Sequence, residues 1–407
     1  MATRRHLLLG GASIAGAATL GGLLGTGDSK AATFAHSATV HPVLPDPAAC
    51  GVDHIVLLVM ENRSFDHILG WLPGANGRQA GLAYPDRTGA PVPTYHLRTF
   101  QGCGHPDPDH SYAGARVVYH GGACDGWLRV NDQFAIGYYT QADLPFLGQA
   151  APAWTVCDNY FTATLAPTIP NRLYLHSAQT DRLDDSIGPT TLPTIWDRLA
   201  AARVSHRYYY NDLSVLSLWG TKYLGISHSY NTFLADAASG NLPAVSYVDP
   251  PLFLEETDGL ARDDHPHGDV RNGEATMNGV YQAITRSPAW PRTVLVITFD
   301  DWGGLFDHVP PTTAPDANPS VTGLRGFRVP ALVISPYAQR NAVAHAVYDH
   351  TSILKLIEWR HGLAPLTARD AAARNLAEVL DFGAPNLSAP QWTVGPVSAL
   401  PCFLVAG

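Results

Sequence analysis

The chain has no excess of positive charge. Its 407 residues include 26 lysines and arginines against 35 aspartates and glutamates, which gives a formal net charge of −9. Proteins that bind nucleic acids depend on clustered cations, so this balance argues against a nucleic acid partner. It also gives the protein no general attraction to anionic membranes. The composition thus excludes recognition of either partner by charge alone.

Cysteine is scarce, and none of the five belongs to a CxxC pair or a thiol–histidine motif. This absence excludes cysteine-based catalysis. In an exported chain four cysteines can pair, and the odd count leaves one free. We expect a Cys103–Cys124 disulfide, because both residues lie in one loop-rich segment. A Cys50–Cys402 bond would tie the two ends of the domain together. The fifth cysteine is Cys157.

Beyond its first residues the chain has no apolar run long enough to span a bilayer. At the start, MATRRHLLLGGASIAGAATLGGLLG places Arg4 and Arg5 directly ahead of a weakly apolar run. This pattern resembles a twin-arginine signal, and small residues near Ala31 suit cleavage. A retained membrane anchor is the alternative. We predict a cleaved signal over 1–31, a flexible mature N-terminus over 32–50, export by the twin-arginine machinery, and an extracellular or cell-envelope location.

Internal repeats and linkers are also absent, so one α/β domain over 51–407 is predicted. Segments that alternate between strand and helix patterns indicate a mainly parallel sheet. Residues 82–126 are rich in Gly, Pro, His and Asp, which predicts loops around a site. The predicted strands are 52–60, 244–248, 293–299 and 331–335, and the predicted helices are 171–179, 194–202, 276–287 and 352–361.

Two predicted strands run directly into oxygen-bearing side chains. In TVLVITFDDWGGLFDHVPP the apolar run ends at Asp300 and Asp301, and in DHIVLLVMENRSFD it ends at Glu61 and Asn62. Adjacent carboxylates at a buried strand end need a neutralising partner. A divalent cation is the usual one, and ligands of α/β sheets collect at the carboxyl ends of strands. Helix capping is the alternative for either pair alone.

A hydroxyl group precedes a predicted helix in TLAPTIPNR. Thr168 lies two residues before Pro170, which favours the first turn of a helix. There the hydroxyl meets free N–H groups and the positive end of the helix dipole. Asn171 and Arg172 would add a neutral donor and a forked cation for phosphoryl oxygens. A simple helix cap is the alternative interpretation of Thr168.

Histidines in three motifs are candidate acids or phosphate contacts. DPDHSY supplies His110, DDHPHGD supplies His265 and His267, and FDHVPP supplies His308. We rank His110 and His265 first. His350 precedes a helix that Asp349 is expected to cap, so we interpret it as structural.

Four motifs together resemble the bacterial phosphoesterase family of phospholipases C and related acid phosphatases. They are MENRSFDHILG, APTIPNRLYLHSA, DDHP with a following GE, and DDWGGLFDHVPP, and the similarity extends from Asp53 to Leu363. The resemblance implies an alkaline-phosphatase-like fold, with a central sheet sandwiched between helices. It implies that a metal is bound by Glu61, Asn62, Asp300 and Asp301. It also implies that Thr168 is the nucleophile and that His110 and His265 line the phosphate pocket. The family commonly has Asp-Glu where this chain has two aspartates, and both pairs bind metal.

These features predict an exported, metal-dependent hydrolase of phosphoric esters that forms a phospho-threonine intermediate. The metal could be Ca, Mn, Mg, Zn or Fe. A sulfatase is one alternative, since Thr168 to Arg172 matches the spacing of C/S-x-P-x-R, but threonine cannot form the formylglycine that sulfatases require. A non-catalytic exported binding protein on the same scaffold is another.

The sequence does not separate phosphate monoesters from diesters or phospholipids. The chain stops soon after the predicted core, so we expect soluble esters to be cleaved better than packed bilayers. An aromatic cluster could instead hold a choline head group by cation–π contact, although core packing is the commoner role of such a cluster. Its members are Tyr208, Tyr209, Tyr210 and Trp219.

Overall fold

Two neighbouring strands at the centre of the sheet place the site. Strand β1 (His54–Met60) pairs in parallel with β11 (Thr293–Phe299), and Met60 lies opposite Phe299. Every residue of β11 and all but the first of β1 are buried, because helices cover both faces of the sheet. The computed structural model describes residues 43–252 and 259–402. Because Met60 pairs with Phe299, β1 and β11 end side by side.

The main sheet has eight strands, and the prediction of a mainly parallel sheet is confirmed. Five of its seven pairings are parallel, and two are antiparallel. Both antiparallel pairings involve 331–334, which the sequence pattern had suggested as a parallel strand. The strand order is β13 (Ala342–Ala344), β6 (Thr155–Cys157), β12 (Ala331–Ile334), β11, β1, β10 (Val245–Val248), β8 (His206–Tyr210) and β9 (Ser227–Ser229).

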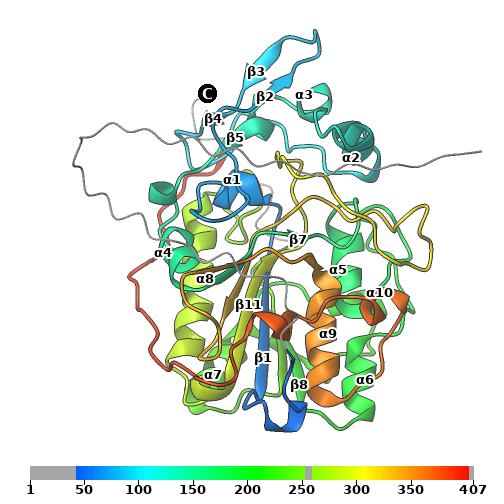
Figure 1. Cartoon of the computed structure of the whole chain (residues 1–407), viewed down its shortest axis with the longest axis vertical. Coiled ribbons are helices and arrows are strands. Elements are labelled where there is room, and N and C mark those ends of the chain that lie inside the picture. Colours follow the sequence, from blue (N-terminus) through cyan, green and yellow to red (C-terminus); the bar gives the residue numbers. More distant parts are fainter. Residues whose placement is uncertain (1–42, 253–258, 403–407) are drawn as a thin grey trace, which may run out of the picture. The chain divides into compact units, whose positions relative to one another are not determined.

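Helices lie on both sides of this sheet (Figure 1). One group comprises α5 (Thr168–Ser177), α6 (Ile195–Ala201), α9 (His350–His361) and α10 (Ala368–Ala371); the other comprises α4 (Leu147–Ala153), α7 (Tyr230–Ser239) and α8 (Val270–Thr285). Helix α8 begins six residues before the predicted start. Asp349 caps α9 and Gly362 ends it in the left-handed conformation, as expected.

The segment predicted as loops lies over the carboxyl ends of the strands (Figure 1). It contains more regular structure than expected, including the helix α2, whose first turn Ser111 caps. The short elements of this part are α1 (Phe65–Leu69), β2 (Ala83–Pro85), β3 (Pro91–Pro93), β4 (Tyr95–His96), α2 (Tyr112–Tyr119), α3 (Trp127–Val130) and β5 (Gly137–Tyr138). Strands β7 (Tyr160–Phe161) and β14 (Tyr348–Asp349) form a separate pair.

The predicted export signal over 1–31 and residues 32–42 lie outside the described residues. Residues 43–50 lead into the domain, and Cys50 is buried there. All the described residues belong to one compact unit. Within them, no helix has both the length and the apolar character that crossing a membrane requires.

The expected Cys103–Cys124 and Cys50–Cys402 disulfides are both wrong. Cys103 pairs with Cys402 across a sequence separation of 299 residues, and the other three cysteines are free and buried. The pairing follows from the path of the C-terminal segment along α8. Side chains of that helix hold the segment there: Asn278 donates to Val394 O at 3.1 Å and Gln282 donates to Trp392 O at 2.7 Å.

The aromatic cluster belongs to the core. Tyr208 and Tyr209 are fully buried, and Trp219 is nearly so. The rings of Tyr208 and Trp219 pack around the buried imidazole of His176. The core interpretation is therefore confirmed for these three rings, and Tyr210 is partly buried against the same core.

Candidate active site

The ends of β1 and β11 bring four predicted metal ligands together at one edge of the sheet. Asp300 N donates to Met60 O at 3.0 Å, which continues the strand pairing past the last paired residues. Asn62 N donates to Asp300 Oδ1 at 3.4 Å. We call Glu61, Asn62, Asp300 and Asp301 the strand-end ligands; all four are buried.

The turn after Asp301 must approach the backbone of Asn62 closely. Gly303 has a φ of 60°, and a Cβ atom built on it would lie 2.2 Å from Asn62 O. Glycine adopts this φ without strain, and because it has no Cβ atom it is the residue that leaves room for Asn62 O. Asp301 Oδ1 accepts the Gly303 N–H at 2.6 Å, which fixes the direction of its other oxygen.

Thr168 reaches the strand-end ligands from the first turn of α5. Its Oγ1 lies 3.3 Å from Glu61 Oε2, 3.4 Å from Asn62 Oδ1 and 3.2 Å from Asp301 Oδ2. One hydroxyl hydrogen cannot satisfy three acceptors. Oxygen atoms of this kind gathered around one point are instead the donor type that a hard divalent cation accepts. The residues present therefore fit a divalent metal.

The pKa shifts of these carboxyl groups also favour a bound cation. Burial raises the pKa of Glu61 well above its ordinary value, and Asp300 adds to the effect. Burial also raises the pKa of Asp301 to about 8, with a further contribution from Asp300. Both shifts show that the protein alone does not stabilise all these negative charges. A bound cation would do so.

Asn171 and Arg172 have partners other than the predicted phosphate. Asn171 donates to Ala166 O at 2.6 Å and accepts from Thr164 N at 3.0 Å, so its amide shapes the loop before α5. Arg172 is 2% exposed, and its guanidinium contacts three carboxylates: Glu61 Oε1 at 2.6 Å, Asp300 Oδ2 at 2.9 Å and Asp249 Oδ1 at 3.1 Å. Both side chains already have partners within the protein, so a phosphate contact by either residue stays a prediction.

Asp249 is a residue that the sequence interpretation missed. It directly follows β10, which pairs with the other side of β1. Burial raises its pKa to about 6, although Arg172 opposes the shift. The pattern of an apolar strand that ends in a carboxylate, already used for β1 and β11, also describes VSYVD and could have identified it.

His110 and His265 lie beside Asn62, as expected for two residues of one pocket. The Nδ1 atoms face the backbone carbonyls of Pro108 and Pro266, so each ring can donate there. In a neutral ring Nε2 is then an acceptor, and in a protonated ring it is a second donor. The Asn62 amide nitrogen lies 3.3 Å from His110 Nε2. The opposite amide orientation would point its oxygen at His265 Nε2. Burial lowers the pKa of His265 to about 4, so this ring is neutral and its Nε2 accepts rather than donates. We therefore retain the orientation that points the Asn62 amide nitrogen at His265 and Oδ1 at Thr168.

The two imidazoles differ in their electrostatic surroundings. Burial disfavours the charged form of His110, but Asp301 and Asp107 outweigh burial and raise its pKa to about 9. Burial lowers the pKa of His265 to about 4. The carboxylates therefore act unequally on two rings whose centroids are 6.3 Å apart.

The structure places His308 and His267 apart from Thr168. His308 Nδ1 contacts Asp66 Oδ2 at 2.5 Å, and Arg328 joins Asp66 to Asp307 in a buried network. The ring of His267 lies against Gly102. His350 Nε2 donates to Asp300 O at 2.6 Å, so it supports the backbone of a strand-end ligand.

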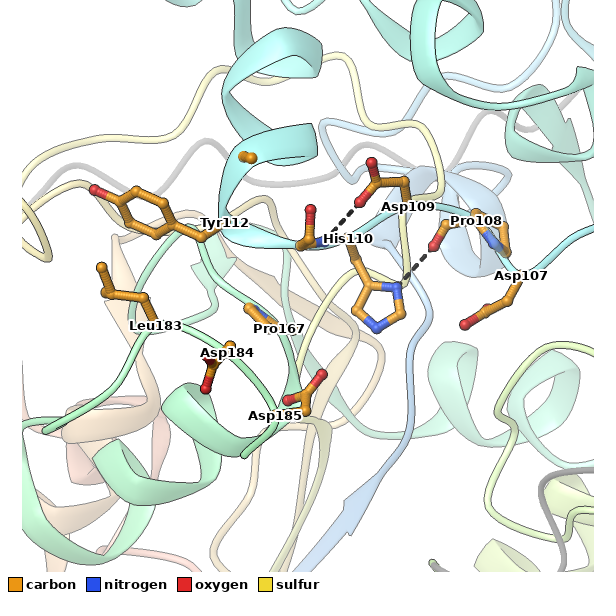
Figure 2. A pocket seen from close by; sticks show the side chains of 11 residues that line it. Asp107, Pro108, Asp109, His110, Tyr112, Pro167, Leu183, Asp184 and Asp185 are labelled. Carbon is orange, nitrogen blue, oxygen red and sulfur yellow. Dashed lines mark hydrogen bonds between the residues drawn. The ribbon is translucent and has the colours of Figure 1, made fainter. Parts of the chain in front are cut away.

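A cavity of about 650 Å³ opens beside His110. Figure 2 shows the His110 ring pointing into it between Asp107 and Asp185, with Pro167, the neighbour of Thr168, close by. Its lining includes four aspartates: Asp107, Asp109, Asp184 and Asp185. Asp185 has no sequence signal that separates it from other loop aspartates. The cavity gives a substrate access to the site.

Comparisons with known proteins found relatives that cover most of the chain. The chain is 34% identical over 435 aligned residues to phospholipase C B of Mycobacterium tuberculosis, with 86% of this chain and 82% of that protein covered. It is 29% identical to non-specific phospholipase C6 of Arabidopsis thaliana, with 86% and 77% covered. Among solved structures, a protein in the alkaline phosphatase superfamily from Vibrio parahaemolyticus is 10% identical, covers 80% of this chain and 70% of its own, and has a TM-score of 0.39.

The model of the Phosphoesterase family matches residues 52–364, a span that contains the strand-end ligands, Thr168, His110 and His265. The motifs that carried the resemblance are thus the segments that meet at the carboxyl edge of the sheet. The chain belongs to the Phosphoesterase family and is a hydrolase that acts on phosphoester bonds.

Proposed function

We propose that the protein is an exported, metal-dependent phosphoric ester hydrolase that works through a phospho-threonine intermediate. The observation that carries the proposal is the position of Thr168 Oγ1, 3.2–3.4 Å from oxygens of Glu61, Asn62 and Asp301. A divalent cation held by the strand-end ligands would lower the pKa of this hydroxyl and offset charge on the phosphoryl oxygens. The same set of intact residues argues against a non-catalytic scaffold.

The remaining steps fall to side chains of the chain itself. Thr168 Oγ1 attacks phosphorus and displaces an alcohol, and water then releases the phosphoryl group from the threonine. His110 points into the cavity, whose wall includes Pro167, the residue before Thr168 (Figure 2), and we assign it the transfer of a proton to the leaving oxygen. His265, whose Nε2 remains an acceptor, orients the Asn62 amide. Arg172 holds Glu61 Oε1 and Asp300 Oδ2, and Glu61 Oε2 lies on the side of Thr168.

Removal of the metal tests the proposal. Dialysis against a chelator should reduce hydrolysis of p-nitrophenyl phosphate to background, and a divalent cation should restore it. Because Arg172 already neutralises part of the carboxylate charge, we expect one metal per chain by mass spectrometry. Full activity of metal-free protein would contradict the metal-dependent mechanism, and the cation that restores most activity would identify the metal.

A substrate panel addresses specificity. The relatives are named phospholipases C, which supports phosphodiesters with lipid substituents as substrates. Values of kcat/KM on a soluble monoester, a soluble choline diester and phosphatidylcholine vesicles would rank the classes. Because the net charge of −9 gives no general attraction to membranes, we expect the soluble esters to be cleaved best, and a clear preference for vesicles would make the enzyme a phospholipase C in the strict sense.

Export is supported by the sequence of the first residues. Arg4 and Arg5 precede a weakly apolar run, a pattern typical of the twin-arginine route. Changing both arginines to lysine should leave the precursor in the cytoplasm, as measured by cell fractionation and immunoblotting. Normal secretion of the double variant would instead indicate the general secretory route.

A further inference from the structure

The loop 181–189 contains a carboxylate that the mechanism above does not use. We infer that Asp185 is a positioning residue, which holds the first turn of α5 and thereby directs Thr168 Oγ1 at the phosphorus atom. The inference rests on the proposed role of Thr168 as the nucleophile.

Helix α5 cannot cap its own N-terminus. The N-cap residue is Pro167, whose side chain has no acceptor and therefore forms no cap hydrogen bond. Pro170 lacks an N–H group, and Asn171 N donates back to Pro167 O. Asp185 Oδ1 accepts the Ile169 N–H at 2.8 Å, so a residue 16 positions further along provides the missing acceptor.

The loop that carries Asp185 is braced from within. Arg182 Nη1 donates to Ser186 O and to Gly188 O, both at 2.6 Å. Thr190 Oγ1 donates to Asp181 Oδ2 at 2.6 Å and closes the other side of the loop. These bonds fix the Asp185 backbone, and through it the acceptor for α5.

The bonded N–H group belongs to the residue next to the nucleophile. Thr168 Oγ1 lies near three oxygens at once, so a small rotation of the first turn would take it out of this position. Misplacement of a reacting group by about 1 Å costs on the order of 100-fold in rate. The anchor at Ile169 should therefore affect the rate of reaction more than the binding of substrate.

Asp185 also lines the cavity beside His110 (Figure 2), so its charge must be separated from its hydrogen bond. Asp185→Asn removes the charge but keeps an oxygen for the Ile169 N–H, whereas Asp185→Ala removes both. Asp184→Ala is the matched control. It removes one charge from the same cavity, and its hydrogen bond from Ser186 N, at 3.1 Å, stays within the loop. Both aspartates are exposed, so the fold should tolerate these changes.

Steady-state kinetics on p-nitrophenyl phosphate and metal content provide the test. Asp185→Ala should lower kcat about 10- to 100-fold, with KM and metal content close to those of the wild type. Asp185→Asn should retain kcat within about threefold because the acceptor remains, and Asp184→Ala should behave as wild type.

Three results would overturn the inference: Asp185→Ala with unchanged kcat, Asp185→Asn as impaired as Asp185→Ala, or Asp184→Ala equally impaired. The last two would assign the effect to charge. The Thr168→Ala variant separates the two levels of proposal. If it is active, the proposed function fails; if it is inactive while Asp185→Ala is unimpaired, only the present inference fails.

Discussion

Thr168→Ala should lower turnover by roughly 10⁴-fold or more, the scale expected when a nucleophile is removed. The methyl group cannot attack phosphorus, and no other hydroxyl is recorded in contact with the strand-end ligands among the described residues. Single-turnover kinetics on p-nitrophenyl phosphate, with metal content measured on the same samples, would give the comparison. The fold should be unchanged, because Thr168 Oγ1 contacts Glu61, Asn62 and Asp301, three side chains that the metal would hold in place.

Thr168→Ser is the matched control for this experiment. Serine keeps the oxygen but loses the methyl group that restricts its rotamers, so it should retain measurable turnover. Trapping with radiolabelled phosphate ester should label the wild type and the serine variant, but not the alanine variant. If the alanine variant keeps more than a few per cent of the wild-type rate, Thr168 is not the nucleophile.

Asp301→Asn should lose the metal and at least about 100-fold of the activity together. Asp301 Oδ2 is 3.2 Å from Thr168 Oγ1. Within the described part of the chain, no arginine or lysine forms an ion pair with this side chain. Burial raises its pKa to about 8, so the metal-free protein favours the neutral form of the carboxyl group more than water does. Asparagine resembles that neutral form in size and charge. The substitution should therefore remove metal binding without harming the metal-free fold.

Thermal unfolding with and without metal distinguishes these effects. In chelator the wild type and Asp301→Asn should have similar Tm values, and added divalent cation should raise only that of the wild type. Asp184→Asn, a substitution at the outer wall of the cavity, should respond to metal as the wild type does. Full metal occupancy in Asp301→Asn would mean that the carboxylate only fixes the Gly303 turn.

Local sequence predicted those parts of the site that depend on neighbours along the chain. An apolar run that ends in a carboxylate defines a strand and its ligand together, so β1 and β11 and the strand-end ligands were identified from their motifs. Likewise, Thr168 was placed at a helix start by the proline two residues later. The capping of α9 by Asp349 followed from a pattern of the same range.

Tertiary structure decided the interactions that join distant segments. Arg172 lies one turn into α5, yet its long side chain reaches carboxylates at the ends of β1, β10 and β11, and only the packing of the helix on the sheet determines that it faces them. The Cys103–Cys402 pair depends on the path of the C-terminal segment along α8. The direction of β12 depends on the connection that precedes it.

The sequence by itself therefore determined the family, the sheet edge that carries the chemistry, and the identity of the expected nucleophile and metal ligands. The structure decided which arginine neutralises Glu61 and Asp300, which histidines lie beside Asn62, and that Asp185 accepts a hydrogen bond from the first turn of α5. The physical reason is range. Backbone propensity and strand-end patterns act over a few residues, whereas ion pairs and caps between segments form only after the sheet and its helices have packed.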